Sequence, residues 1–531
     1  MEAVSAKGLS FRHNTAKKPA LEGVRLSAAA GELVMLMGSS GSGKTTLLRL
    51  LKPEIAPLGE VSGEIRIFGE KAAATQPKVG YVPQHPEEGF VSDTVRGEIM
   101  FAPENAGLSP EEVRRLTAET VSRFGLGKLL SRKLDDLSGG EKQLVCLCAA
   151  MVVQPDILLL DEPFSRLDPV AAENMAALIL RVNRELGVTV IVAEHSAEQL
   201  FAECDRVVFL ENGRVTADLP PRKAAALPAV RAYAPAAARA FANAEPLPLT
   251  VREGREMLAH TEHLVEVPLP QGKVFTEKVL EADGLRFAFT RGGEDILDGT
   301  DIVLHKGEFL ALAGANGSGK TTLLRVLAGL ARPYAGKLKI GGKPPKKAAL
   351  RVGMLPQEAA DLFLQPTVLE DYRYALKAMG KPENMAEEML ARLGAEHLGN
   401  MHPYDLSGGE LQLCALGRVL LCKPDILLAD EPTKGLDPIS ASRMGHLLKE
   451  LCAEGKAVLA VTHDLEFAAC HADSCAIFCG GRAESLMPSP HFFARAGFYS
   501  TAAGRISRGM VKNAYLTEHL QAAFGGGTYD R

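Results

Sequence analysis

The sequence predicts an α/β protein with two tandem units, each built on a mixed, largely parallel sheet with helices. One observation is the pattern G-x-x-x-x-G-K-T, which occurs twice and each time separates an apolar run from a helix-like stretch. A second observation is a set of apolar runs that alternate with helical patterns, at 157–160, 188–193, 426–428 and 457–461. Continuous apolar strands between helices are typical of parallel sheets that are buried on both faces.

The two glycine-rich motifs belong to a repeat that divides the chain. Lys44 and Lys320 are 276 positions apart, and Glu162 and Glu431, which belong to a second shared motif, are 269 positions apart. Such a repeat indicates two copies of one domain. The expected organisation is a first domain at 1–218, an Ala- and Pro-rich linker with one or two short helices at 219–277, a second domain at 278–485 and a C-terminal tail at 486–531.

The composition of the chain disfavours several classes of protein function. A hydrophobic content of 46% with 24% charged residues is ordinary for a soluble globular protein, and the net charge of −5 gives no footprint of nucleic-acid binding. The nine cysteines lack the spacing of a zinc site, which favours free thiols in a reducing compartment. No signal peptide and no apolar run of about 18 residues is present, so any work at a membrane would need partner proteins.

Both glycine-rich stretches are expected to bind phosphate groups. Glycines let successive backbone N–H groups face one anion, with the positive end of the following helix behind them. Lys44 and Lys320 would reach the terminal phosphates, and the hydroxyls of Thr45 and Thr321 would bind Mg²⁺. The residues expected to hold the nucleotide are Gly38, Ser39, Ser40, Gly41, Ser42, Gly43, Lys44, Thr45 and Thr46 in the first copy, and Gly314, Ala315, Asn316, Gly317, Ser318, Gly319, Lys320, Thr321 and Thr322 in the second.

An Asp-Glu pair follows an apolar run in each copy. The side chains of Asp161-Glu162 and Asp430-Glu431 would therefore emerge at the carboxyl end of a strand, where α/β proteins bind ligands. The aspartate suits a contact with Mg²⁺, and the glutamate can polarise a water for attack on the γ-phosphate. An acidic turn after a strand would be the simpler explanation for either pair without the neighbouring phosphate loop.

Histidines and glutamines repeat in the same order. His195 and His463 follow apolar strands at matching places in the two copies, which favours a role in sensing the γ-phosphate over a purely structural one. Gln84 and Gln357 could contact Mg²⁺ and the attacking water.

A Leu-Ser-Gly-Gly-Glu motif closes a mostly helical stretch in each copy, and this stretch is expected to form a subdomain beside the sheet. A Ser-Gly-Gly that opens a helix offers a hydroxyl, free N–H groups and a helix dipole, which together form a second anion site. An N-capped helix after a glycine turn would use the same residues. The residues expected at this second anion site are Ser138, Gly139, Gly140 and Glu141, and Ser407, Gly408, Gly409 and Glu410.

In this order, the motifs resemble those of the ATP-binding-cassette (ABC) ATPases, and the resemblance covers both copies. In that family each ATP lies between the phosphate loop of one cassette and the signature motif of the other. The resemblance implies ATP and Mg²⁺ as cofactors and sites in which Lys44 works with Ser407 and Gly409, and Lys320 with Ser138 and Gly140. His13 and Phe289 lie 25 residues before the first glycine of each loop, where the family stacks an aromatic ring on adenine. The histidine departs from the usual tyrosine.

Finer features resemble one branch, the ATPases of energy-coupling factor (ECF) importers. These features are Phe-Ala-Pro-Glu-Asn at 101–105, Pro-Leu-Thr-Val-Arg-Glu-Gly at 248–254 and Phe-Tyr-Ser-Thr-Ala-Ala at 498–503. The resemblance implies a peripheral protein on the cytoplasmic face of the membrane. Its partners would be a membrane scaffold protein and a substrate-binding membrane protein that import vitamins, metal ions or small metabolites.

The resemblance to the ECF branch also implies that carboxylates after the two glutamines receive arginines of the membrane scaffold. They are Glu87, Glu88, Asp93 and Glu98 in the first copy, and Asp361, Glu370 and Asp371 in the second. A solvated helical face is the plainer explanation for any one of them.

Two other functions stay open. One is the tandem ATPase of another ABC importer, although sugar-importer ATPases commonly carry one degenerate site and both copies here keep their Lys, Gln, Asp-Glu and His. The other is a soluble ribosome-associated ABC protein, which the Ala/Pro-rich linker and negative net charge disfavour. Phe164, where the second copy has Thr433, departs from the family pattern and puts the equivalence of the two sites in question.

Overall fold

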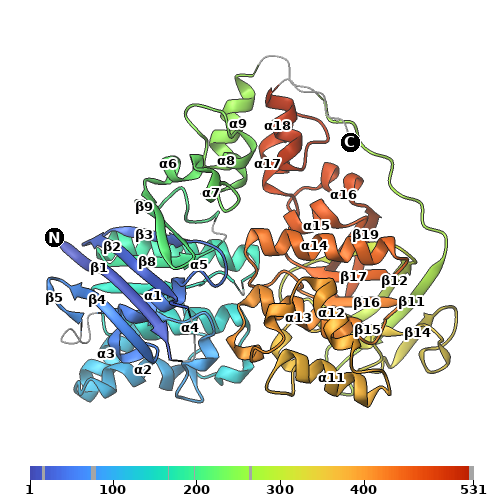
Figure 1. Ribbon diagram of the computed structural model, residues 1–531, viewed down its shortest axis with the longest axis horizontal. Helices are drawn as coiled ribbons and strands as arrows, with labels where there is room; N and C mark the ends of the chain where they lie inside the picture. Colours follow the sequence, from blue (N-terminus) through green and yellow to red (C-terminus); the bar gives the residue numbers. More distant parts are fainter. Residues whose placement is uncertain (15–17, 73–78, 166, 196–197, 262–265, 526–531) are drawn as a thin grey trace. The chain divides into compact units, whose positions relative to one another are not determined.

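The structure is a computed structural model that describes residues 1–14, 18–72, 79–165, 167–195, 198–261 and 266–525. The chain divides into two compact units, Met1–Leu249 and Thr250–Arg531. Each unit contains one antiparallel sheet, one largely parallel sheet and a group of helices (Figure 1).

The first unit holds a four-stranded and a six-stranded sheet. The four-stranded sheet has the order β2-β1-β4-β5 and is formed by β1 (Glu2–His13), β2 (Leu21–Ala29), β4 (Gly59–Ile67) and β5 (Glu70–Lys71). The six-stranded sheet has the order β10-β9-β3-β8-β7-β6 and is formed by β3 (Leu33–Met37), β6 (Val79–Val82), β7 (Ile157–Asp161), β8 (Thr189–Glu194), β9 (Arg206–Glu211) and β10 (Arg214–Leu219). All pairs in this second sheet are parallel except β9 with β10.

The strand β3 is buried on both faces, which explains its uninterrupted apolar sequence. Leu33, Met35 and Met37 join a core with the helical elements, whereas Val34 and Leu36 join a second core with the antiparallel sheet and the first helix. Because side chains alternate along a strand, an all-apolar sequence is needed where both faces are covered. The helices of this unit are α1 (Lys44–Leu50), α2 (Val95–Asn105), α3 (Pro110–Phe124), α4 (Gly139–Met151), α5 (Pro169–Leu186), α6 (Pro221–Ala226), α7 (Pro228–Arg231) and α8 (Ala236–Ala240).

The segment expected to be a linker is partly core. Ala224, Val230, Tyr233 and Leu249 are buried in the same apolar cluster as β3 of the first unit. In the described part of this segment there are four short helices instead of one or two, three of them in the first unit and α9 (Val251–Ala259) in the second. The small alanine side chains let the three helices of the first unit pack closely on its sheet domain, so a composition that is typical of a linker here builds a packed layer.

The second unit repeats the same plan. Its three-stranded sheet has the order β12-β11-β14 and is formed by β11 (Lys278–Phe287), β12 (Leu297–His305) and β14 (Ala335–Ile340). Its six-stranded sheet has the order β15-β16-β17-β13-β18-β19 and is formed by β13 (Phe309–Ala313), β15 (Val352–Leu355), β16 (Ile426–Asp430), β17 (Ala457–Thr462), β18 (Ser474–Cys479) and β19 (Arg482–Pro488). The α/β fold with two largely parallel sheets, predicted from the sequence, is confirmed.

The tail of the chain is part of the second unit. Its helix α17 packs against α9, where the guanidinium of Arg255 donates to the carbonyl oxygens of Arg505 at 2.9 Å and Arg508 at 3.0 Å. Residues 526–531 of the expected tail lie outside the described part. The helices of the unit, besides α9, are α10 (Lys320–Leu327), α11 (Val368–Ala378), α12 (Met385–Leu393), α13 (Gly408–Leu420), α14 (Pro438–Ala453), α15 (Leu465–His471), α16 (Ser489–Arg495), α17 (Ala502–Ser507) and α18 (Thr517–Gly525). Among the described residues, no helix has the length and apolar character needed to span a membrane.

Two of the carboxylates that were expected to contact a membrane partner are buried and accept hydrogen bonds within the helical subdomains. Glu98 is buried and accepts the N–H groups of Val91 and Ser92, each at 3.0 Å. Asp371 is fully buried and accepts Leu364 N–H at 2.8 Å and Arg418 Nε at 2.7 Å. The expectation for these two residues is therefore wrong, because each fastens the loop before its helix to the helix itself.

We predict that Arg418→Met destabilises the second unit by about 3–5 kcal/mol, because the buried carboxylate of Asp371 would lose its counter-charge. The matched control is Arg373→Met, which removes an exposed ion pair between α11, the helix of Asp371, and Glu387 of α12, and should cost about 0–1 kcal/mol. Hydrogen exchange of the α11 and α13 amides measures both values. Equal losses in the two variants would contradict the importance of the buried pair.

Candidate functional site

The phosphate loop of each unit connects the central strand to a short helix. In the first unit it runs from β3 to α1, and Lys44 Nζ donates to the carbonyl oxygens of Gly38 and Ser39, both at 2.9 Å. In the second unit Lys320 Nζ makes the same two bonds within its own loop, both at 2.8 Å. Each lysine is buried and spans its loop from within, next to the N-terminus of the following helix.

The loops have the features of a phosphate cradle. A Cβ on Gly38 would lie 2.1 Å from the carbonyl oxygen of Leu210, and a Cβ on Gly314 would lie 2.6 Å from that of Phe478, so only glycine fits at either place. Within the described part of the chain, the buried hydroxyls of Ser42 and Ser318 have no hydrogen-bond partner. Buried polar groups are nearly always satisfied, and phosphate oxygens would satisfy these two.

Oxygen ligands suited to Mg²⁺ lie beside each loop. Thr45 Oγ1 donates to Asp161 Oδ1 at 3.1 Å, and Tyr81 donates to the other carboxylate oxygen at 3.1 Å. Burial, together with the nearby Glu162, raises the pKa of Asp161 to about 6 against the hydrogen bond from Thr45. Burial likewise raises the pKa of Asp430 to about 6. A hydroxyl and a carboxylate held together fit a hard cation that prefers oxygen ligands.

The two glutamates after these aspartates have strained backbones. Glu162 has φ 45° and Glu431 has φ 49°, which is uncommon for residues other than glycine. Each amide is held by the neighbouring strand, since Glu162 N donates to Ala193 O and Glu431 N donates to Val461 O, both at 2.9 Å. Strain of this kind persists where the surrounding structure fixes it, and it clusters at functional sites.

A histidine faces each strained glutamate. His195 Nδ1 lies 3.3 Å from Glu162 Oε1, and His463 Nδ1 lies 2.8 Å from Glu431 Oε2. Burial alone would raise the pKa of each glutamate, but the neighbouring histidine outweighs it and lowers that pKa. The glutamates raise the pKa of their histidines in the same way, against burial. Both pairs therefore favour an ionised carboxylate next to a charged imidazole.

The predicted glutamines differ between the units. Gln84 Nε2 donates to Glu162 Oε2 at 2.6 Å. Gln357 is exposed and makes no hydrogen bond among the described residues. The structure thus brings Gln84 to its glutamate, but it does not bring Gln357 to Glu431.

The signature residues form helix N-termini. Ser138 and Ser407 cap α4 and α13, and Glu141 and Glu410 each accept the N–H of the capping serine, at 2.8 Å and 2.9 Å. This reciprocal arrangement is a capping box, so the two glutamates have a structural role in each unit. The serine hydroxyls and the first N–H groups of the helices stay at the helix end, where they can meet an anion.

The residues expected to stack on adenine are accessible. Phe289 is 70% exposed and lies edge-on to Phe287 with ring centroids 5.2 Å apart. His13 is partly buried and lies edge-on to Phe11 with ring centroids 4.7 Å apart.

Two residues near the phosphate loop of the first unit were not predicted from the sequence. Tyr81, which holds Asp161, has Met354 at the matching place of the second unit, so the repeat gave no signal for it. Glu194 is almost fully buried beside His195, and burial raises its pKa to about 7. The sequence Ala-Glu-His, where the second copy has Val-Thr-His, was the available signal.

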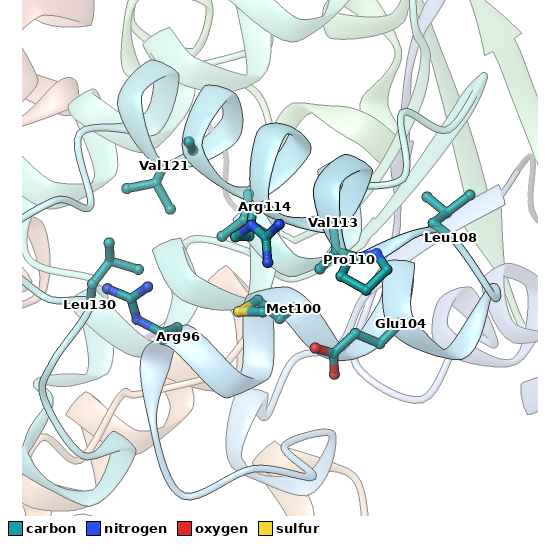
Figure 2. A pocket seen from close by; sticks show the side chains of 11 residues that line it. Arg96, Met100, Glu104, Leu108, Pro110, Val113, Arg114, Val121 and Leu130 are labelled. Atoms are coloured by element: carbon teal, nitrogen blue, oxygen red, sulfur yellow. The ribbon is translucent and has the colours of Figure 1, made fainter.

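A pocket of about 590 Å³ lies away from these residues, between α2 and α3 of the first unit (Figure 2). Arg96 and Arg114 point over its apolar floor, which includes Met100. None of the residues predicted to bind nucleotide lines it.

Comparisons with known proteins agree with two repeated ATPase units. The family described as "ABC transporter" matches residues 21–165 and 297–434. A putative ABC transporter ATP-binding protein of Bacillus cereus is 36% identical and aligns over 97% of both chains. The putative HMP/thiamine import ATP-binding protein YkoD of Bacillus subtilis is 31% identical and aligns over 89% of both chains.

Solved structures show the same fold. An archaeal ribosome recycling factor, aABCE1, solved with the ribosomal stalk protein aP1, has a TM-score of 0.59 at 23% identity. The alignment covers 92% of this chain and 91% of that chain. With both units matched by the family and with full-length relatives above 30% identity, the chain belongs to the ABC transporter family and is an ATPase with two ATP-binding cassettes.

Proposed function

We propose that this ATPase energises a membrane importer of the ECF type and that both of its cassettes hydrolyse ATP. The observation that carries the proposal is the presence, in each unit, of a phosphate loop, a magnesium-type Thr-Asp pair and a strained glutamate paired with a histidine. The importer role draws on the relative YkoD, whose name describes an import ATP-binding protein. We propose a vitamin, metal ion or small metabolite as the transported substrate.

In the proposed reaction the residues of one site divide the work. Lys44 and the loop N–H groups would hold the β- and γ-phosphates of ATP, and Mg²⁺ held by Thr45 and Asp161 would neutralise charge on them. Glu162, kept ionised by His195 and aligned by Gln84, would orient a water and accept its proton. His195 would donate a hydrogen bond to the γ-phosphate and so couple the state of the nucleotide to the position of β8.

We further propose that the two ATP sites are composite and head to tail. Each unit offers a phosphate loop and, separately, a capped helix N-terminus with a serine hydroxyl. Lys44 would then share one nucleotide with Ser407 and Gly409, and Lys320 would share the other with Ser138 and Gly140. ATP binding would bring the cassettes together and hydrolysis would release them, as in other γ-phosphate switches.

The surface proposed to receive the membrane scaffold repeats in both units. After each glutamine an apolar residue is solvent-exposed, Val91 at 60% and Leu364 at 70%, and an aromatic residue follows on the next helix, Phe101 at 45% and Tyr374 at 50%. The carboxylates that remain exposed beside them are Glu87, Glu88, Asp93, Asp361 and Glu370. Exposed apolar side chains rimmed by carboxylates suit an amphipathic helix that carries arginines.

The pocket between α2 and α3 is not expected to bind the arginine-bearing helix of the scaffold. Its charged lining is Arg96 and Arg114 against one carboxylate, Glu104, so its net positive charge would repel the arginines of the scaffold. The exposed residues Val91 and Phe101, which do not line this pocket, are therefore proposed as the docking residues of the first unit.

We predict that Glu162→Gln and Glu431→Gln each reduce hydrolysis at their own site by at least about a hundredfold, because the general base is lost. ATP binding should persist, since the phosphate loop is unchanged. Phosphate release and equilibrium ATP binding measure the two effects. Hydrolysis at the wild-type rate in the double variant would show that these glutamates are not the catalytic bases.

We predict that Asp93→Arg combined with Asp361→Arg weakens co-purification of polytopic membrane proteins, because the charge that would pair with arginine is reversed in both units. The matched control reverses two exposed glutamates on edge strands, Glu70→Arg with Glu484→Arg, and should leave co-purification unchanged. ATP hydrolysis of the isolated chain should be the same in all three proteins. Unchanged co-purification in the first variant, or capture of ribosomes in place of membrane proteins, would contradict the proposed partner.

A further inference from the structure

The first ATP site holds a carboxylate that the second site lacks. Glu194 ends β8 and is 1% exposed, whereas Thr462 occupies the matching place at the end of β17. Glu194 Oε1 accepts Phe164 N–H at 3.1 Å, and Glu194 Oε2 accepts His195 N–H at 3.3 Å. One buried side chain thus ties the residue after β8 to the loop that follows Glu162.

In the second unit a different side chain accepts the backbone N–H of the histidine. There Glu431 Oε2 accepts His463 N–H at 3.3 Å and also lies 2.8 Å from the ring nitrogen of the same histidine. Thr462 Oγ1 instead accepts the N–H of Asp464, at 3.0 Å. In the second unit Glu431, the proposed catalytic glutamate, therefore holds the backbone of its histidine and lies against the ring as well.

In the first unit two different carboxylates contact the backbone and the ring of the histidine. Glu194 takes the backbone N–H of His195, which leaves the two oxygens of Glu162 to the ring of His195 and to Gln84 Nε2. This difference matches the placement of the two glutamines, since Gln357 makes no hydrogen bond among the described residues. It also matches the change from Thr433 to Phe164, whose N–H is the second group that Glu194 holds.

We propose that Glu194 is a positioning residue of the first ATP site, where it fixes the backbones of His195 and Phe164 so that Glu162 can engage Gln84 as well as the histidine. The inference rests on the proposed function, because it takes Glu162 and His195 as groups that act on ATP. The two ATP sites then differ in how their glutamate and histidine are positioned. Changes at Glu194 alter turnover at the first site alone, since the second site has Thr462 at the matching place.

The test uses the full chain with Glu431→Gln, so that hydrolysis in a single turnover reports the first site. Glu194→Gln keeps the shape of the side chain but turns an NH₂ group toward one of the two N–H donors. We expect the single-turnover rate to fall roughly tenfold to a hundredfold, because misplacing a reacting group by about 1 Å has an effect of that order. The dissociation constant for ATP should change by less than about twofold, because the phosphate loop is untouched.

A second variant and a control complete the experiment. Glu194→Thr introduces the residue that the second unit has at this place, so the fold already accommodates it there, and loss of both acceptor oxygens should lower the rate at least as much. Glu308→Gln is the matched control: Glu308 is 3% exposed and accepts His305 N–H at 2.9 Å, but no residue of the proposed sites contacts it in the structure as described. This control should leave the single-turnover rate unchanged.

The outcomes separate the two proposals. Unchanged rates in both Glu194 variants, or equal losses in Glu308→Gln, would overturn the positioning role. Loss of ATP affinity in parallel with the rate would also overturn it, since that pattern indicates general damage to the site. A parent chain that neither binds nor hydrolyses ATP would contradict the proposed function itself.

Discussion

The parallel pairing of three buried strands in each unit is the constraint on which the site depends. In the first unit β3 pairs with β8, and β8 pairs with β7, so Met37 lies beside Glu194 and Asp161 lies beside Ala193. Because the strands run in the same direction, their carboxyl ends meet at one edge of the sheet. The phosphate loop lies more than 100 residues before the Asp-Glu pair, and the histidine follows the pair by about 30 residues, yet this edge holds all three together.

The same edge allows charged groups to be buried. An isolated carboxylate in the core would be costly, but Glu162 and Glu431 each face a histidine and a lysine of their own site. The strained backbones of both glutamates are fixed by a hydrogen bond to the adjacent strand. The apolar strands therefore supply the stability that keeps a strained and charged site in place.

Sequence reasoning predicted what the repeat and local chemistry determine. The strands β3 and β13 coincide with the apolar runs that precede the two glycine-rich motifs, and each motif forms a loop between its strand and a helix. The features that were not predicted depend on tertiary packing. The Ala-rich segment after residue 218 packs into a core because neighbouring surface is available, and Glu98 and Asp371 turn inward because loop N–H groups need acceptors. The different surroundings of Gln84 and Gln357 depend on side-chain contacts that no spacing encodes.

The two units are similar but not identical, and their proposed cooperation can be measured with a double-mutant cycle on ATP binding and turnover. The cycle compares Lys44→Ala with Ser407→Ala, and separately Lys44→Ala with Ser138→Ala. If each nucleotide is shared head to tail, the first pair is coupled by at least about 0.5 kcal/mol and the second pair is additive. Coupling between Lys44 and Ser138, with additivity between Lys44 and Ser407, would contradict the composite sites.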